Sequence, residues 1–287
     1  MSRHSFRGAV WALAFAFYAG VHTPARAQPP ADQPLTNQPP ATQPLRDFCP
    51  DRPGLGTPPC TVDPGHGDIE LGLAGWTLTR DQGARTEDFA LGAMLVRYGL
   101  DDNLEAQIGW TAAGVERMRD ASGRVRHQSG TGDLLFALKQ NLVHPDGSGF
   151  SLAFLPFATL PTGTGPLRSG TWGAGLVVPM SWQLPHGLQL AATLEADAAP
   201  DSDGHGRHFA SDGVLGLGFN LGKTVGATLE LGAYRDEDPT GSSSRLVGAA
   251  SLAWKPRSDL QLDTGIAVGL AGQAPELALS LGVSRRF

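Results

Sequence analysis

From residue 68 to Phe287, the chain repeats one pattern: segments of ten to thirteen residues in which apolar side chains alternate with polar or small ones. Side chains that alternate with a period of two lie on opposite faces of a β-strand. The last segment is the clearest, because Leu277, Leu279, Leu281 and Val283 alternate with small or polar residues. We therefore expect an all-β chain. Its predicted strands are 68–80, 88–100, 103–114, 131–143, 150–161, 172–184, 187–198, 211–221, 224–235, 244–255, 259–271 and 276–287.

The connections between these segments alternate in length. Tight turns such as 100–103 and 184–187 alternate with longer, more polar connections such as 115–130 and 162–171. A soluble β-sandwich has no need for this alternation, whereas a transmembrane β-barrel has short periplasmic turns and longer extracellular loops. A tilted spanning strand needs roughly 9–11 residues, which the segments supply. The sequence thus predicts a transmembrane antiparallel up-and-down β-barrel of about 12 strands over 68–287, with both of its ends on the periplasmic side.

The apolar face of each predicted strand requires an apolar partner. Only 17% of the residues are charged, which is low for a soluble globule. In a bilayer these faces would contact outer-membrane lipids, and closure of the barrel would leave no unpaired strand edge. Aromatic residues near the strand ends suit the interfacial girdles of such a barrel. These residues are Trp76, Tyr98, Trp110, Trp172, Trp182, Trp254 and Phe287.

The first 27 residues have the features of a secretory signal peptide. MSRHSFR is basic, GAVWALAFAFYAGV is apolar, and Ala25-Arg26-Ala27 is an A-x-A cleavage site. An amphipathic N-terminal helix is the alternative. Removal of residues 1–27 removes three arginines and no acid, so the mature chain has 19 basic and 28 acidic residues and a net charge of −9. We expect an exported protein of a Gram-negative-type cell outer membrane that binds no nucleic acid.

Two short segments precede the predicted barrel. Residues 28–47 are rich in proline and predict a disordered linker. Residues 48–67 contain the only two cysteines, Cys49 and Cys60, on either side of a Pro- and Gly-rich stretch. In an oxidising compartment this arrangement predicts a disulfide-closed N-terminal segment. A metal site with His66 as a third ligand is the alternative.

The polar faces of the predicted strands would line a lumen. Arg97 and Glu105 lie symmetrically about the turn at residue 101, so both side chains point the same way. Inward is expected, because a lipid-facing charge costs roughly 2–4 kcal/mol at mid-bilayer. The lumen candidates are Arg97, Glu105, Gln107, Asp133, Lys139, Asn141, Glu195, Asp197, Glu230 and Asp263. They would either bind a solute or form a structural network that keeps the wall rigid.

The sequence gives little support for an enzyme. The histidines after residue 27 fall in predicted loops or turns, without a G-x-S-x-G motif or a clear triad arrangement. A cation could bind the loop that contains Asp201, Asp203, His205 and His208, although a solvated acidic loop is the simpler interpretation. We expect no catalytic residue, no metal and no cofactor. The histidines are His66, His127, His144, His186, His205 and His208.

Several short motifs resemble one family. They are CPDRPG and TPPC around the cysteines, VDPGH before the first strand, RYGL (97–100) with Glu105 after the turn, TGDLLFALKQNL (131–142) and LPTGTG (160–165). Together they resemble the phenol degradation meta-pathway family of outer-membrane β-barrel proteins, which are described as transporters. This resemblance implies a porin-like channel for small hydrophobic or aromatic solutes. The alternative is a non-conducting structural or interaction barrel that acts through its extracellular loops.

Two further expectations concern the ends of the predicted mature chain. Residues 28–64 precede the first strand, so we expect them to plug or gate the lumen from the periplasmic side. Phe287 resembles the C-terminal aromatic residue that the outer-membrane assembly machinery reads in many barrels. We therefore expect Phe287 to be an assembly signal and the machinery to be a partner.

Overall fold

The computed structural model describes residues 44–287, of which Arg46–Phe287 form one compact unit. The signal peptide expected at 1–27 and most of the predicted linker lie outside the described residues. The described residues contain these strands: β1 (Gly67–Asp81), β2 (Ala84–Gly99), β3 (Leu104–Arg119), β4 (Val125–Gly130), β5 (Leu134–Val143), β6 (Phe150–Leu160), β7 (Gly173–Leu184), β8 (Leu188–Pro200), β9 (Arg207–Asn220), β10 (Val225–Asp236), β11 (Ser243–Arg257), β12 (Leu260–Gly272) and β13 (Leu277–Arg286).

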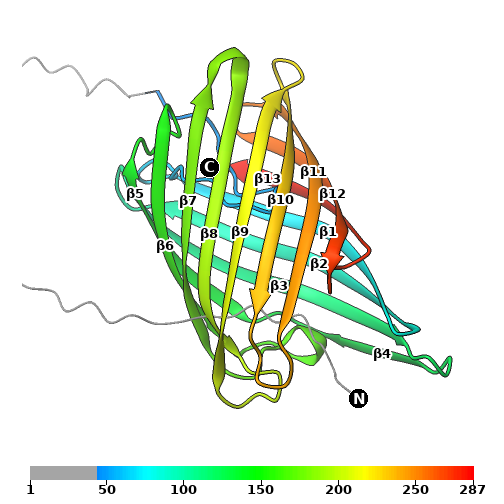
Figure 1. The fold of residues 1–287 in the computed structure, drawn as a ribbon. Helices are drawn as coiled ribbons and strands as arrows, with labels where there is room; N and C mark the ends of the chain where they lie inside the picture. Colours follow the sequence, from blue (N-terminus) through cyan, green and yellow to red (C-terminus); the bar gives the residue numbers. More distant parts are fainter. Residues whose placement is uncertain (1–43) are drawn as a thin grey trace, which may run out of the picture. The chain divides into compact units, whose positions relative to one another are not determined.

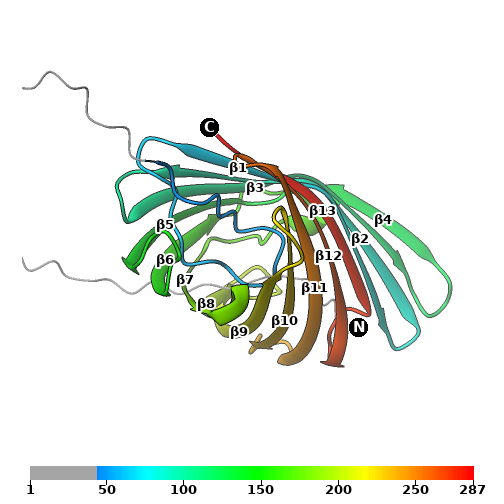
Figure 2. The ribbon, with the colours of Figure 1, turned by 90° about the horizontal axis from the view of Figure 1, so that it is seen from above.

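Every strand except β4 belongs to one closed antiparallel ring (Figures 1 and 2). Consecutive strands of the ring pair with each other, β3 pairs with β5, and β13 pairs with β1. The closing pair begins at Asp68↔Arg286 and ends at Leu78↔Leu277. The predicted 12-stranded transmembrane β-barrel is thus confirmed, with β4 as one extra strand that pairs only with β3.

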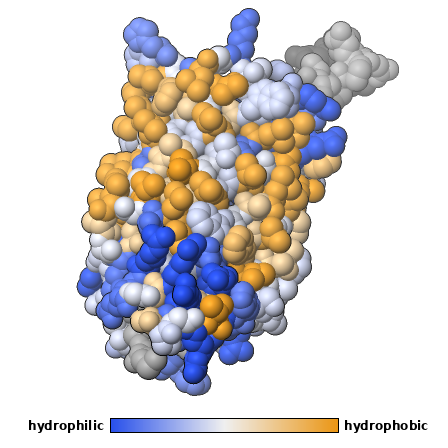
Figure 3. Space-filling model, turned by 90° about the vertical axis from the view of Figure 1, so that its right-hand side faces the viewer, coloured by the Kyte–Doolittle hydropathy of each residue, from blue (hydrophilic) through white to orange (hydrophobic). Residues whose placement is uncertain are grey.

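The alternating sequence pattern separates an apolar outer face from a polar inner face. Leu229 of β10 lies opposite Leu217 of β9, and Leu231 lies opposite Leu215. Leu215 and Leu229 are 59% and 52% exposed, far more than leucines in a soluble core. Glu230, between the two leucines of β10, has the opposite orientation and reaches into the lumen, where it bonds to the chain inside. The apolar surface is extensive (Figure 3), as contact with lipid requires.

Two predicted connections are wrong. The region 115–130 is largely strand, because β3 continues to Arg119 and β4 pairs with it. The predicted connection at 81–87 is a turn of two residues, Gln82 and Gly83, both with positive φ as in the favoured hairpin turns. These extensions carry charged residues on both faces, so apolar periodicity did not mark them. They extend beyond the ring at the lower right of Figure 1.

The remaining connections define the two ends of the barrel. At the end where β1 begins and β13 ends, the connections are 100–103, 144–149, 185–187, 221–224 and 258–259. The opposite end has 161–172, 201–206 and 237–242 as its longer connections. We therefore call the first end periplasmic and the second extracellular. Within residues 44–287 the helical segments are two single 3₁₀ turns, η1 (Gly165–Leu167) and η2 (Pro185–Gly187).

Among the described residues, no helix has both the length and the apolar character needed to span a membrane.

Candidate functional site

Residues 46–63, which we call the lumenal segment, run through the interior of the ring (Figure 2). Backbone groups of this segment form hydrogen bonds with inward-facing side chains from many strands. Because β3 and β5 bind it on one wall and β10 and β12 on another, the segment crosses the lumen. The strands that bind its backbone are β1, β2, β3, β5, β8, β10, β11, β12 and β13.

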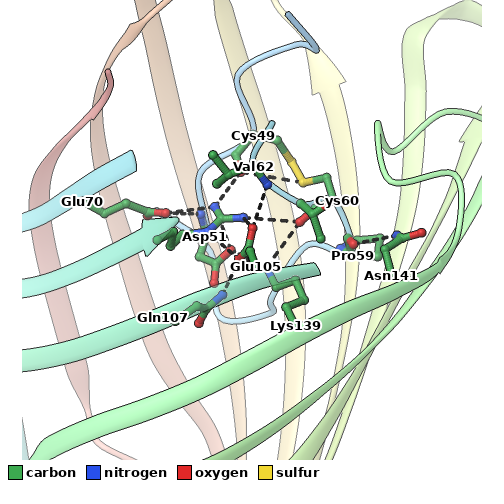
Figure 4. Close-up of polar contacts among 12 residues, drawn as sticks. Cys49, Asp51, Pro59, Cys60, Val62, Glu70, Glu105, Gln107, Lys139 and Asn141 are labelled. Atoms are coloured by element: carbon green, nitrogen blue, oxygen red, sulfur yellow. Dashed lines mark hydrogen bonds and ion pairs between the residues drawn. A yellow bond between two sulfur atoms is a disulfide. The ribbon is translucent and has the colours of Figure 1, made fainter. Parts of the chain in front are cut away.

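Arg97 is the centre of the contact between the wall and the segment, and its partners Glu70, Glu105, Cys49 and Cys60 are labelled in Figure 4. Its Nε and Nη2 donate to the two carboxylate oxygens of Glu105 at 2.9 and 3.0 Å. Its Nη1 donates to Oε1 of Glu70 at 3.1 Å, and Nη1 and Nη2 also donate to the carbonyl oxygens of Cys49 and Cys60. The guanidinium is fully buried, and its donors bind both the barrel and the segment.

Lys139 of β5 extends this charge network. Its Nζ lies 3.0 Å from Oδ1 of Asp51 in the lumenal segment and 3.5 Å from Oε1 of Glu105. Gln107 donates from Nε2 to Glu105 at 2.6 Å. Asn141, two residues along β5, donates to a carbonyl oxygen of the lumenal segment at 2.8 Å. The structure thus brings five of the lumen candidates predicted from β2, β3 and β5 to one place.

Two further glutamates hold the segment by its backbone. Glu70 of β1 accepts hydrogen bonds from the amides of residues 51–52 at 2.8 and 2.9 Å. Glu230 of β10 accepts from the amides of residues 55–56 at 2.8–3.0 Å. Charged acceptors make hydrogen bonds that are roughly twice as strong as neutral ones. Carboxylates on two walls therefore fix the course of a Gly- and Pro-rich chain that has no regular structure of its own.

The disulfide predicted between Cys49 and Cys60 is confirmed. It closes the lumenal segment on itself next to Arg97, whose donors reach the carbonyl oxygens of both cysteines. The alternative metal site is wrong, because both sulfur atoms are used in the bond. The Nδ1 of His66 lies 3.2 Å from the Pro64 carbonyl oxygen instead.

The other predicted acids lie in three different environments. Asp263 of β12 binds the side chain of Arg52 in the lumenal segment at 3.0 Å. Asp133 accepts hydrogen bonds from backbone amides of the connection 161–172, so it braces an extracellular loop. Glu195 and Asp197 of β8 lie with Asp212 of β9, and oxygens of the three carboxylates are within 4.8 Å of one another. Such a group suits a hard cation, but it does not by itself establish a site.

Part of the inner wall is apolar. Ala137, Leu155 and Val177 form a buried cluster on β5, β6 and β7, with Leu135 and Phe157 packed against it. A cavity of about 410 Å³ lies between the lumenal segment and the wall formed by β1, β2, β3 and β5, and it reaches the cluster only at Leu135. Its lining combines apolar side chains with charged groups of the lumenal segment and the barrel. It includes Leu95, Leu135, Asp51, Arg52, Glu70 and Asp133.

Sequence reasoning missed several residues that bind the lumenal segment. Glu70 lies in the stretch GDIELGL, where Asp68 and Glu70 alternate with Ile69 and Leu71. That alternation could have placed Glu70 on the inward face. Asp51 and Arg52 belong to an irregular stretch, so no periodicity could place their side chains.

The closed ring, the apolar outer face and the polar groups of the interior define a membrane-spanning β-barrel of the outer-membrane type. The family model described as "Putative MetA-pathway of phenol degradation" matches residues 50–287, and the chain belongs to this family. No curated protein matches the sequence.

Two solved structures show the same fold. One is an outer membrane channel from Pseudomonas putida F1, with a TM-score of 0.62 and 17% identity, over 79% of this chain and 100% of that one. The other is the translocator domain of the autotransporter NalP from Neisseria meningitidis, with a TM-score of 0.50 and 14% identity, over 78% and 88% of the two chains. The first is a channel and the second a translocator domain, so neither is described as an enzyme. The closed β-barrel and its apolar outer face support an outer-membrane location for this chain.

Proposed function

We propose that this chain lets small molecules with a mainly apolar or aromatic body cross the outer membrane through its lumen. The observation that carries the proposal is the inward-facing apolar cluster of Ala137, Leu155 and Val177, which shares the interior with the charged groups that hold the lumenal segment. A barrel that conducts only hydrated ions or sugars has no need for such a cluster. Ligand sites for organic molecules combine apolar walls with a few polar groups, as the neighbouring cavity does.

The lumenal segment is the gate in this proposal. It crosses the interior and is held at several walls by hydrogen bonds and ion pairs. These contacts can be exchanged for water one at a time, whereas the strands of the barrel are fixed by continuous ladders. Partial release of residues 51–57 would widen the path beside the apolar cluster while the disulfide keeps the remainder in place.

Solute flux into liposomes tests the proposed selectivity. Aromatic carboxylates are suitable probes, because their charge limits leakage through the lipid, and sugars of similar size provide the comparison. The full-length protein should admit the aromatic carboxylates faster. Replacing Val177 by Asp should remove this preference, whereas Ser181→Asp, at an inward position of the same strand outside the cluster, should leave it unchanged. Equal rates for both solute classes in the full-length protein would contradict the proposed substrate class.

A second candidate function is a permanently closed barrel that acts through its extracellular loops. The number of walls that hold the lumenal segment favours this alternative. Conductance distinguishes the two, because a closed barrel passes no current whatever solute is offered.

A further inference from the structure

Three arginines lie next to one another at the extracellular end of the sheet. Arg80 of β1 is the register partner of Arg85 of β2, and Arg85 is the partner of Arg119 of β3. Directly opposed residues on neighbouring strands share one face, and like charges in that position repel. The fold thus holds three guanidinium groups in one row, and their mutual repulsion destabilises the sheet at this point. This repulsion indicates that a bound anion would stabilise the row.

The protein neutralises this row only in part. Arg80 pairs with Glu276 at 2.6 Å, and Arg85 pairs with Glu87 at 2.8 Å. Arg119 makes no hydrogen bond or ion pair within residues 44–287, and the Nε of Arg85 has no hydrogen-bond partner there. The guanidinium of Arg119 therefore remains for a ligand, whereas the Nε of Arg85 has no partner but is buried.

The row borders a hollow of about 440 Å³. The β1–β2 turn and the connection 120–124 form its sides, and all three arginines line it. Asp120 also lines it, but its Oδ1 accepts hydrogen bonds from Ser122 and Arg124 within its own turn. Asp81 is the second acid of the lining. The planar fork of an arginine side chain matches the oxygens of a phosphate group. A hollow lined by three arginines therefore suits a phosphate.

The same face of the sheet becomes apolar toward the membrane. From the arginine row toward the membrane, the cross-strand rows are Leu78–Glu87–Arg117, then Trp76–Phe89–Val115, then Ala74–Leu91–Ala113. Phe89 and Leu91 are 41% and 48% exposed. Figure 3, which views the side toward which these strands extend, shows a hydrophilic area below the apolar surface. A basic row next to an aromatic and aliphatic face is the arrangement that a lipid with an anionic headgroup would contact.

We propose that this hollow binds the phosphate groups of a phosphorylated glycolipid of the outer leaflet, with the chemistry of lipid A. Phosphate oxygens would bind Arg85 and Arg119, and the acyl chains would pack on the face that contains Phe89 and Leu91. The apolar rows favour a lipid over free phosphate, because a free anion has no use for them. This site is separate from the lumen and does not depend on what the lumen conducts.

Native mass spectrometry of the full-length protein in detergent tests the proposal. The probes are bisphosphorylated lipid A, the same lipid without its phosphates, phosphatidylglycerol and inorganic phosphate. Bisphosphorylated lipid A should bind more tightly than each of the others by about tenfold, since charge-assisted hydrogen bonds of this kind are lost without the phosphates. The variant R85Q/R119Q should reduce its affinity by about tenfold.

The control variant R126Q/R235Q removes the same charge at the extracellular end. Arg126 is the partner of Met118 on the other face of the sheet, and Arg235 is on β10. Its affinity should stay within about twofold of the wild type. Heat-modifiable mobility in gels verifies folding, and R119Q alone serves if the double variant does not fold. An equal loss in the control, or equal binding of dephosphorylated lipid, phosphatidylglycerol or inorganic phosphate, would overturn the proposal.

Discussion

Arg97 of β2 and Glu105 of β3 are diagonal neighbours on the inner face beside a periplasmic turn, and they form two parallel hydrogen bonds of 2.9 and 3.0 Å. Both side chains are fully buried. Arg97 also binds the Cys60 carbonyl oxygen, and Glu105 accepts from the Val62 amide at 2.8 Å. The barrel wall and the lumenal segment therefore share one charge network, and a change in the wall should alter the segment.

Replacing Arg97 by Gln should destabilise the protein strongly. The substitution leaves Glu70 and Glu105 buried without their guanidinium partner, which typically costs about 3–5 kcal/mol. Urea unfolding in lipid vesicles measures the change. The control is Arg235→Gln, which removes an exposed ion pair with Glu237 and should cost about 0–1 kcal/mol. Similar losses for the two variants would show that the buried network does not stabilise the barrel.

Opening the disulfide should loosen the lumenal segment while leaving the barrel closed. Cys49 and Cys60 are 11 residues apart, and a loop of this size is worth roughly 2–4 kcal/mol. In the variant C49S/C60S, hydrogen exchange of residues 46–63 should be faster, and exchange within the strands should be unchanged. Dithiothreitol should have the same effect on the wild type and none on the variant. Unchanged exchange in residues 46–63 would mean that the wall alone fixes the segment.

Asp238 should titrate at unusually low pH. Burial alone would raise its pKa, but hydrogen bonds from Thr240 and Ser202 outweigh that effect and lower the pKa from 3.8 to about 2. Because the folded pKa is the lower one, the stabilisation is complete above 3.8 and is lost as the pH falls toward 2. The NMR shift of the Ser202 amide, which donates to Asp238 at 2.7 Å, should follow this transition. A midpoint near 3.8, or the same transition in D238N, would contradict it.

Removal of Phe287 should reduce outer-membrane assembly severalfold. Its amide donates to the Gly67 carbonyl oxygen at 2.8 Å and its carbonyl accepts from the Gly67 amide, so it completes the seam between β13 and β1. Its side chain is exposed and available to a receptor. The folded fraction in outer membranes measures the effect, with Phe287→Trp as the control that keeps an aromatic ring. Equal assembly after removal would exclude an assembly signal at this residue.

The architecture of the ring could be predicted because lipid requires every spanning strand to alternate. Leu277, Leu279 and Leu281 have no other way to avoid water, and this constraint repeats around the ring. The hairpin of β3 and β4 was not predicted, because it has polar residues on both faces, Arg117 and His127 on one and Glu116 and Gln128 on the other. There the backbone pairing, rather than burial, defines the strands.

The lumen was predictable in part for a related reason. Arg97, Glu105 and Lys139 share the inward parity of strands whose other face is apolar, so their meeting follows from register. The partners from residues 46–63 could not be placed, since an irregular Pro- and Gly-rich chain carries no periodic signal. Asp212 was missed because it lies opposite Glu195 only through the pairing of β8 with β9.

Conductance in planar lipid bilayers tests the central claim most directly, that this barrel is a channel whose lumen is gated by the segment before its first strand. The full-length protein should show small, discrete openings. Deletion of residues 28–64 should yield a larger and steadier conductance. If the deletion leaves conductance unchanged, the segment is not a gate, and if neither protein conducts, the barrel is not a channel.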